Sequence, residues 1–219
     1  MNKQFGNDDA RTAEYILRVY EPEDAVLREI RERSAREGLP DIQVAPLDAR
    51  HLEVLTRALG ARRAVEIGAL GGYSGVSILR GLAAGGALHT IELDAHHAEV
   101  ARESFRRAGF GDRAEVHVGP AREVLPRLAP LGPFDLVFVD ADKEGYPAYL
   151  DWAAHNLRPG GAVILDNAFL FGQLPDQPKG DRAKSIAAMQ ATHERLARSG
   201  LFRATALPTG EGLAVGIRV

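Results

Sequence analysis

The stretch that decides the fold is Phe134-Asp-Leu-Val-Phe-Val-Asp-Ala-Asp-Lys143, an apolar run that ends abruptly in charged side chains. Val163-Ile-Leu-Asp-Asn167 repeats this pattern further along the chain. Each run is typical of a buried strand, and ligands bind at the carboxyl ends of strands in an open parallel sheet. Two strands that end in such oxygen-bearing side chains indicate a site for a small divalent cation, with a lysine beside it.

Strands and helices alternate on both sides of this stretch. The apolar runs predict strands at 64–67, 87–91, 114–118, 134–139 and 162–165, with helices between them. This alternation is typical of an α/β fold, a doubly wound parallel sheet with helices on both faces. The runs 202–207 and 213–219 are separated only by 208–212, and so short a connection requires an antiparallel hairpin.

Length and composition bound the kind of protein. The 219 residues suit a single domain, 1–219, in which 1–40 form a helical extension. A net charge of −3 provides no global attraction to nucleic acid or membrane. The chain has no cysteine, and Met1 to Asp9 lacks the apolar core of a signal peptide. We expect a cytoplasmic enzyme.

A glycine-rich turn, Glu66-Ile-Gly-Ala-Leu-Gly-Gly-Tyr-Ser74, follows the first predicted strand. Glycines let the backbone approach a ligand, and the next helix start favours an anionic group. Leu70 occupies the middle glycine position of the dinucleotide fingerprint, so a pyrophosphate is less expected. Glu66 and Ser74 suit a zwitterionic amino-acid group instead, and Glu92, at the end of the second strand, suits ribose hydroxyls.

The catalytic residues are expected at the ends of the fourth and fifth strands. Asp140, Asp166 and Asn167 offer two carboxylates and an amide oxygen to a hard cation such as Mg²⁺, which leaves positions for a vicinal diphenol and water. Lys143 is the candidate general base. Asp142 has three open roles: orienting Lys143, contacting adenine, or facing solvent.

Together, the glycine turn, the Asp-x-x-Lys run with Tyr146, Arg158-Pro-Gly-Gly161 and Asp166-Asn167 resemble the cation-dependent O-methyltransferases, which include catechol and caffeoyl-CoA O-methyltransferases. The resemblance implies a Rossmann-like class I methyltransferase fold of seven strands and S-adenosylmethionine as cofactor. It also implies Mg²⁺, or another divalent cation such as Mn²⁺ or Ca²⁺. The cofactor-binding residues it implies are Val44, Glu66, Gly68, Ser74, Glu92, Ala121 and Asp140.

Two departures leave the acceptor open. Leu70 stands where catechol enzymes often have an aromatic residue, and Ala49-Arg50 replaces a common glycine-glutamine pair. The substrate walls are expected from the segment near Ile42 and from the 170–180 loop, where Phe169 and Phe171 could stack on an aromatic ring.

Three functions compete. The first is Mg²⁺-dependent methylation of a small catechol-like phenol. The second is the same chemistry on hydroxyuridine in tRNA, which requires a basic surface at the site mouth; Lys179, Arg182 and Lys184 form only a thin patch. The third is a nicotinamide-dependent dehydrogenase, which Leu70 and the terminal hairpin disfavour.

Two further expectations concern the histidines and the amino-terminal helices. None of the seven histidines forms a spaced pair typical of a metal site, and His89 and His117 are expected as buried or edge residues with satisfied nitrogens. The resemblance implies a homodimer. The apolar stripe of residues 1–40 suits either a dimer contact or packing on its own subunit.

Overall fold

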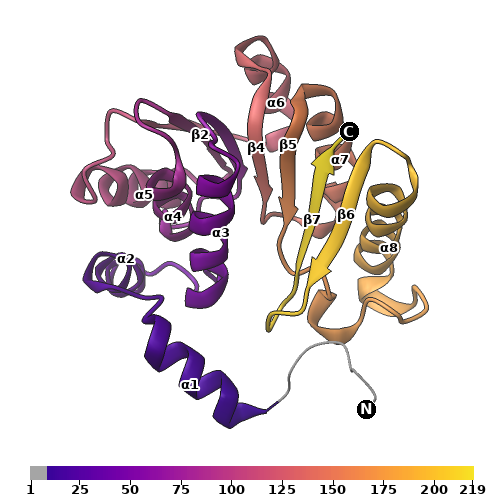
Figure 1. The fold of residues 1–219 in the computed structure, drawn as a ribbon, viewed down its shortest axis with the longest axis horizontal. Helices are drawn as coiled ribbons and strands as arrows, with labels where there is room; N and C mark the ends of the chain where they lie inside the picture. Colours follow the sequence, from indigo (N-terminus) through magenta and orange to yellow (C-terminus); the bar gives the residue numbers. More distant parts are fainter. Residues whose placement is uncertain (1–8) are drawn as a thin grey trace.

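The computed structural model describes residues 9–219, and its centre is a seven-stranded sheet in the order β3-β2-β1-β4-β5-β7-β6 (Figure 1). Strands β1 to β5 pair in parallel, whereas β7 pairs antiparallel with both β5 and β6. The predicted α/β fold and its antiparallel hairpin are therefore confirmed. The strands are β1 Arg63–Ile67, β2 Ala87–Glu92, β3 Ala114–Val118, β4 Phe134–Val139, β5 Leu157–Leu165, β6 Phe202–Leu207 and β7 Leu213–Arg218.

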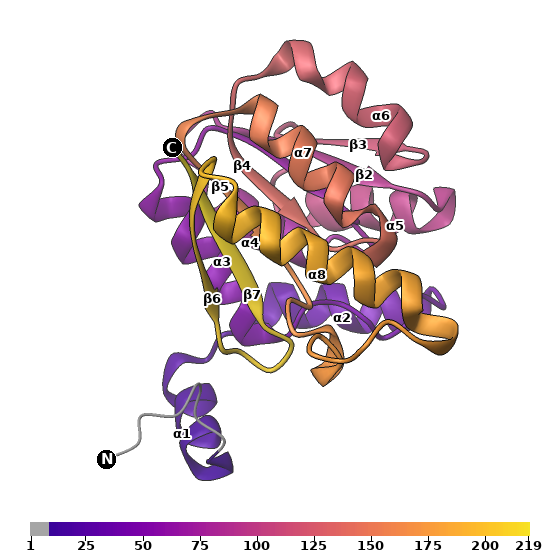
Figure 2. The same cartoon turned by 90° about the vertical axis from the view of Figure 1, so that its right-hand side faces the viewer.

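Helices cover both faces of this sheet. In Figure 2, α7 and α8 lie in front of the strands, whereas α3, α4 and α5 lie behind them. The described helices are α1 Ala10–Tyr20, α2 Ala25–Arg36, α3 Pro46–Ala58, α4 Tyr73–Gly81, α5 Ala95–Arg107, α6 Ala121–Leu128, α7 Tyr146–Asn156 and α8 Ala183–Arg198. Four short 3₁₀ turns are Ala129–Leu131, Lys143–Gly145, Leu170–Gly172 and Gly180–Arg182.

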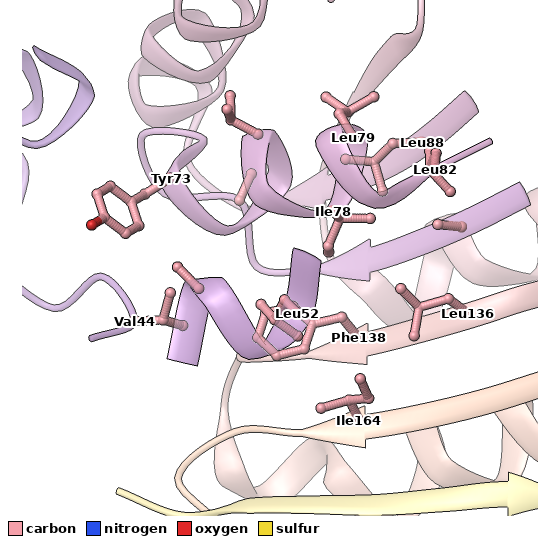
Figure 3. Close-up of a cluster of buried hydrophobic side chains, with 14 of the residues drawn as sticks. Val44, Leu52, Tyr73, Ile78, Leu79, Leu82, Leu88, Leu136, Phe138 and Ile164 are labelled. Carbon is pink, nitrogen blue, oxygen red and sulfur yellow. The ribbon is translucent and has the colours of Figure 1, made fainter. Parts of the chain in front are cut away.

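The strands are apolar on both faces because each face is buried under helices. Leu136, Phe138 and Ile164 face one core, where Figure 3 shows them beside Leu52 of α3 and Ile78 of α4. Alternate residues of the same strands face a second core, made with side chains of α6, α7 and α8. Burying one such side chain contributes about 1.5–3 kcal/mol, so these two cores hold the strand ends in place.

The largest difference from the predicted strand boundaries is at β5, which begins at Leu157 rather than at 162, whereas β1, β2 and β7 differ by one residue each. The segment predicted as a turn, Arg158–Gly161, extends the strand, and the pairing with β4 shifts register between Phe134 and Leu136. Arg158 Nε lies 2.5 Å from Asp135 Oδ1, while Asp135 Oδ2 accepts the backbone N–H groups of Arg62 and Arg63 at 2.8 Å. This carboxylate therefore ties the starts of three neighbouring strands together.

The amino-terminal helices differ in how they contact the body. Leu27 and Ile30 anchor α2, whereas α1 buries none of its residues and projects away from the sheet (Figures 1 and 2). The first eight residues of the predicted 1–40 extension lie outside the described residues. Within residues 9–219, no helix combines the length and apolarity needed to cross a membrane.

Candidate active site

A cavity of about 780 Å³ opens at the carboxyl ends of the parallel strands. Its walls are the turns that follow β1 to β5, together with the segment before α3. The chain leaves β1 and β4, which are neighbours, toward opposite halves of the sheet, and such a switch point is where open α/β sheets bind ligands. The predicted residues that line it are Val44, Gly68, Ser74, Glu92, Ala121, Asp140, Asp142, Lys143, Asp166 and Asn167.

Gly68 brings the first turn against the fourth strand. Its φ of +98° lies in the region that favours glycine, and a Cβ there would lie 1.9 Å from the carbonyl oxygen of Asp140. Glu92 Oε2 fixes the rest of the turn by accepting the backbone N–H groups of Ala69 at 3.1 Å and Leu70 at 2.8 Å. Leu70, where the dinucleotide fingerprint has glycine, is held at a φ of +45°.

Glu66 lies beneath this turn, outside the cavity lining. Its two carboxylate oxygens accept the hydroxyl groups of Ser74 and Thr90, each at 2.6 Å, and burial raises the pKa of Glu66 to about 7. The predicted direct contact with the cofactor therefore gives way to a supporting role. Ser74 lines the cavity. Because its hydroxyl group donates its hydrogen bond to Glu66, its oxygen can only accept a hydrogen bond from a ligand.

The predicted metal ligands come together at the ends of β4 and β5. The N–H of Asp140 donates to the Ile67 carbonyl and that of Asp166 to the Val139 carbonyl, both at 2.9 Å, so the ladder continues into the turns. Asn167 has a φ of +49°, a conformation that Asn tolerates better than most residues. Backbone conformations of this kind cluster at functional sites.

Asp140 and Asp166 share one nearby cation, Lys143, so their negative charge is only partly neutralised within residues 9–219. Burial and the Asp140 carboxylate raise the pKa of Asp166 to about 7, and its Oδ1 has no hydrogen-bond partner within residues 9–219. Burial also raises the pKa of Asp140, against the lowering effect of Lys143. Buried oxygen ligands with uncompensated negative charge are the donor set that a hard divalent cation prefers. The residues present therefore fit such an ion.

Lys143 is held in the cavity by a tyrosine. Its Nζ lies 3.3 Å from Asp140 Oδ1 and donates to the hydroxyl of Tyr146 at 2.7 Å. That hydroxyl in turn points at the carbonyls of Val139, at 3.2 Å, and Asp166, at 3.1 Å. Tyr146 is fully buried at the start of α7, so it fixes the ammonium against the strand ends.

Three acids that line the cavity were not predicted: Asp41, which is exposed, Asp48 and Glu211. Asp48, in the first turn of α3, is 2% exposed, and its Oδ1 has no hydrogen-bond partner among the described residues. Glu211, from the β6–β7 hairpin, has a buried Oε2 that likewise lacks one in the described chain. The sequence contained little indication of Asp48 or Glu211, because an acid in the first turn of a helix and a charged residue in a tight turn are both common without a function.

The hairpin also fixes the strand-end loop. The N–H of Ala168 donates to the Gly212 carbonyl at 2.9 Å, and that of Phe169 to the Glu211 carbonyl at 3.1 Å. The Phe169 ring packs so closely against Gly212 that a Cβ on residue 212 would lie 2.6 Å from the ring. Of the two phenylalanines predicted to face the substrate, only Phe171 lines the cavity.

Asp142 has a partner that narrows its role. Its Oδ1 accepts the hydroxyl of Tyr149 at 2.6 Å, whereas Lys143 contacts Asp140 and Tyr146. The idea that Asp142 orients Lys143 is therefore not supported by the contacts of the described residues. Asp142 lines the cavity, as Ala121 does, and is exposed, so the adenine contact and the solvent-facing role both stay predictions.

Comparison with known proteins gives consistent matches. The sequence profile of the O-methyltransferase family matches residues 17–219. A catechol O-methyltransferase from Mycobacterium tuberculosis is 43% identical over 171 residues, which cover 78% of this chain and 76% of that protein.

Solved structures agree in fold. An O-methyltransferase from Bacillus cereus in complex with SAH has a TM-score of 0.88 and 34% identity, over 95% of this chain and 97% of that one. An O-methyltransferase from Streptomyces achromogenes, involved in tomaymycin synthesis and solved with SAM, has a TM-score of 0.86 and 34% identity, over 95% and 96%. The profile match over most of the sequence, together with these relatives, shows that the chain belongs to the O-methyltransferase family.

Proposed function

We propose that this protein is a Mg²⁺-dependent O-methyltransferase that moves a methyl group from S-adenosylmethionine to a small catechol-like acceptor. The observation that carries the proposal is the buried Oδ1 of Asp166, which has no hydrogen-bond partner within residues 9–219 and lies beside Asp140 in the same cavity as the glycine turn and Lys143. A relative is named a catechol O-methyltransferase, and structural relatives hold SAM or SAH.

The cofactor would occupy the side of the cavity formed by the ends of β1, β2 and β3. The amino terminus of α4 and the Ser74 oxygen suit the carboxylate and ammonium of its methionine part. Glu92 Oε2 is committed to the glycine turn, whereas Oε1 accepts the N–H of Asp94 at 3.0 Å and keeps a further acceptor position for a ribose hydroxyl. Val44 and Ala121 supply apolar contacts.

Asp140, Asp166 and Asn167 would hold the cation, Mg²⁺ or another divalent ion such as Mn²⁺ or Ca²⁺. The bound ion would lower the pKa of an acceptor hydroxyl and fix its orientation. Lys143 Nζ, once neutral, would accept the proton of that hydroxyl. Tyr146 keeps Nζ at the strand ends, so the deprotonated oxygen is produced where it can attack the methyl group.

The charge of the cavity favours a small acceptor over RNA. The cavity lining contains more acidic than basic side chains. The basic ones are Arg122 and Lys143, and the acidic ones are Asp41, Asp48, Glu92, Asp140, Asp142, Asp166 and Glu211. A polyanion would be repelled by such a surface, even with one divalent ion bound. Methylation of tRNA hydroxyuridine therefore remains the second candidate, and family membership gives no support to the dehydrogenase alternative.

The test is methyl transfer from labelled S-adenosylmethionine to a panel of vicinal diphenols, with Mg²⁺ and with a chelator. We expect label in the diphenol with Mg²⁺ and none with chelator. Cofactor binding without turnover of any diphenol would overturn the acceptor assignment and favour hydroxyuridine tRNA. Turnover that the chelator leaves unchanged would overturn the role of the metal.

We also propose that the working form is a homodimer. The apolar side chains of α1 include Tyr15, Leu17, Val19 and Tyr20, which are all exposed, and α1 buries none of its residues against the described chain. Within the predicted 1–40 extension, α2 does pack on its own subunit through Leu27 and Ile30, whereas α1 shows no such packing among the described residues. A second copy of the chain would give this stripe a partner.

A further inference from the structure

His89, Glu115 and His117 form a cluster on the edge of the sheet, apart from the active-site cavity. Strands β2 and β3 are parallel neighbours, and His89 is in register with Glu115. Glu115 and His117 are two residues apart on β3, so they point to the same face of the sheet. The sequence showed no sign of this cluster, because only the pairing of β2 with β3 brings the three side chains together.

The spacing of the three ligand groups matches one metal ion. His89 Nδ1 lies 3.2 Å from His117 Nε2 and 3.3 Å from Glu115 Oε2, and His117 Nε2 lies 3.8 Å from Glu115 Oε1. For metal–ligand bonds of about 2.0–2.2 Å in tetrahedral geometry, neighbouring ligand atoms are separated by about 3.3–3.6 Å. An ion could therefore contact all three groups after small side-chain movements.

The surroundings favour imidazoles in the form that binds metals. The histidine side chains are 16% and 20% exposed, and burial lowers the pKa of both rings against the opposing effect of Glu115. Only an unprotonated nitrogen can bind a metal. Glu115 is 65% exposed, so one side of the cluster is open to water as a fourth ligand.

We propose that His89, Glu115 and His117 form a second metal site, for a borderline transition metal such as Zn²⁺. Two imidazole nitrogens and one carboxylate are a common ligand set for Zn²⁺, whereas Mg²⁺ prefers oxygen ligands. The site therefore differs in chemistry from Asp140, Asp166 and Asn167, and the two would not compete for the same ion.

The position of the site gives the ion a structural role. Strand β3 is at the edge of the sheet and pairs only with β2 in the described chain, and one ion would join the two strands through their side chains. Both strands lead into the cavity: the N–H of Gly119 donates to the Glu92 carbonyl at 2.9 Å, and both residues line it. The bound ion should raise the melting temperature, because it binds only the folded arrangement.

The test uses Co²⁺ as a spectroscopic substitute for Zn²⁺ in the full-length protein. Tetrahedral Co²⁺ absorbs visible light far more strongly than octahedral Co²⁺, so this site is distinguishable from an oxygen site. We expect an intense band that saturates at one equivalent, is removed by one equivalent of Zn²⁺ and survives excess Mg²⁺. Zn²⁺ should also raise the melting temperature.

Variants locate the band. His117→Ala should abolish it, and Glu115→Gln, at an exposed position that folding tolerates, should weaken Co²⁺ binding at least about tenfold. His155→Ala, at an exposed histidine of α7, is the matched control and should change nothing. Asp166→Asn should keep the band. Absence of a band in the unmodified protein, its persistence in both cluster variants, or its loss in Asp166→Asn would overturn the proposal.

Discussion

Glu66 shows how one residue is tuned by burial. Its carboxyl group lies fully inside the protein and accepts two hydroxyl groups, from Ser74 and Thr90. Removal from water raises the pKa from 4.5 to about 7, because the two hydrogen bonds only partly offset the cost of burying a charge. Ionisation of Glu66 should therefore weaken the folded state, and this residue is a probe of how tightly the glycine turn is packed.

The stability of the protein should depend on pH through Glu66. The folded-state pKa is raised, so its contribution is fully present below about pH 4.5 and is lost as pH rises through about 7. Between pH 5 and pH 8 the free energy of unfolding of the unmodified protein should fall by up to about 2.5 kcal/mol more than that of Glu66→Gln, which cannot ionise, at 1.36 kcal/mol per pKa unit. Urea unfolding at both pH values measures this difference. Glu14→Gln, at an exposed position of α1, is the control, and a variant curve parallel to the unmodified one would contradict the account.

At the scale of elements, the turn between β1 and α4 sets the distance between the cofactor side and the metal side of the cavity. The backbone of Gly68 lies so close to the Asp140 carbonyl that no side chain fits between them. Glu92 holds the same turn from the other side through two backbone N–H groups. Three strand ends are thereby joined at one point.

Gly68→Ala should disrupt this junction. A Cβ at 1.9 Å from the Asp140 oxygen forces the two turns apart, and we expect loss of S-adenosylmethionine binding and destabilisation of more than about 3 kcal/mol. Gly85→Ala is the matched control: its φ is also positive, at +73°, but its Cβ would meet nothing within 4 Å. That change should cost only about 1–2 kcal/mol and leave binding intact. Calorimetric titration with the cofactor compares the two, and equal affinities would contradict the account.

The elements were largely predictable from the sequence, and the site was predictable in part. Apolar runs and short connections determine strands such as β4 and the terminal hairpin, because these features are local in the chain. Acids at strand ends converge by the geometry of any parallel sheet, so Asp140 and Asp166 could be placed together. Asp48 and Glu211 could not, because only tertiary packing brings a helix start and a hairpin turn to that cavity.

The sequence did not reveal the cluster of His89, Glu115 and His117, nor the buried position of Glu66, because both depend on how the strands pack. Which strands become neighbours determines whether His89 meets His117, and the sequence order alone leaves this pairing open. Glu66 was expected to contact the amino-acid part of a ligand because it lies two residues before Gly68, but its carboxylate is fully buried and accepts the hydroxyl groups of Ser74 and Thr90. Strand pairing and tertiary packing are thus the information that the sequence patterns did not contain.

On the scale of the whole molecule, α1 projects away from the described body of the protein (Figure 1). It buries none of its residues, and its exposed Tyr15, Leu17, Val19 and Tyr20 would be an unusual apolar surface for an isolated chain. The remainder of the molecule builds its cores without it. An association role for α1 is consistent with both facts.

Deletion of residues 1–20 should convert a dimer to a monomer, as measured by light scattering coupled to size-exclusion chromatography. The deletion should leave the melting temperature nearly unchanged at low concentration, because α1 contributes no buried residue to the described fold. Deletion of residues 1–8 alone is the control and should preserve the dimer. A dimer that persists without residues 1–20 would remove this role from α1.

The central claim is that Asp166 holds the metal and Lys143 moves the proton, so the two should fail differently. The measurement is the rate of methyl transfer to a vicinal diphenol as Mg²⁺ is titrated into the unmodified protein, Asp166→Ala and Lys143→Ala. Asp166→Ala should be inactive at every Mg²⁺ concentration. Lys143→Ala should respond to the same Mg²⁺ concentrations as the unmodified protein, with turnover reduced by about 10²–10⁴-fold. Full Mg²⁺-stimulated activity in Asp166→Ala would contradict the account.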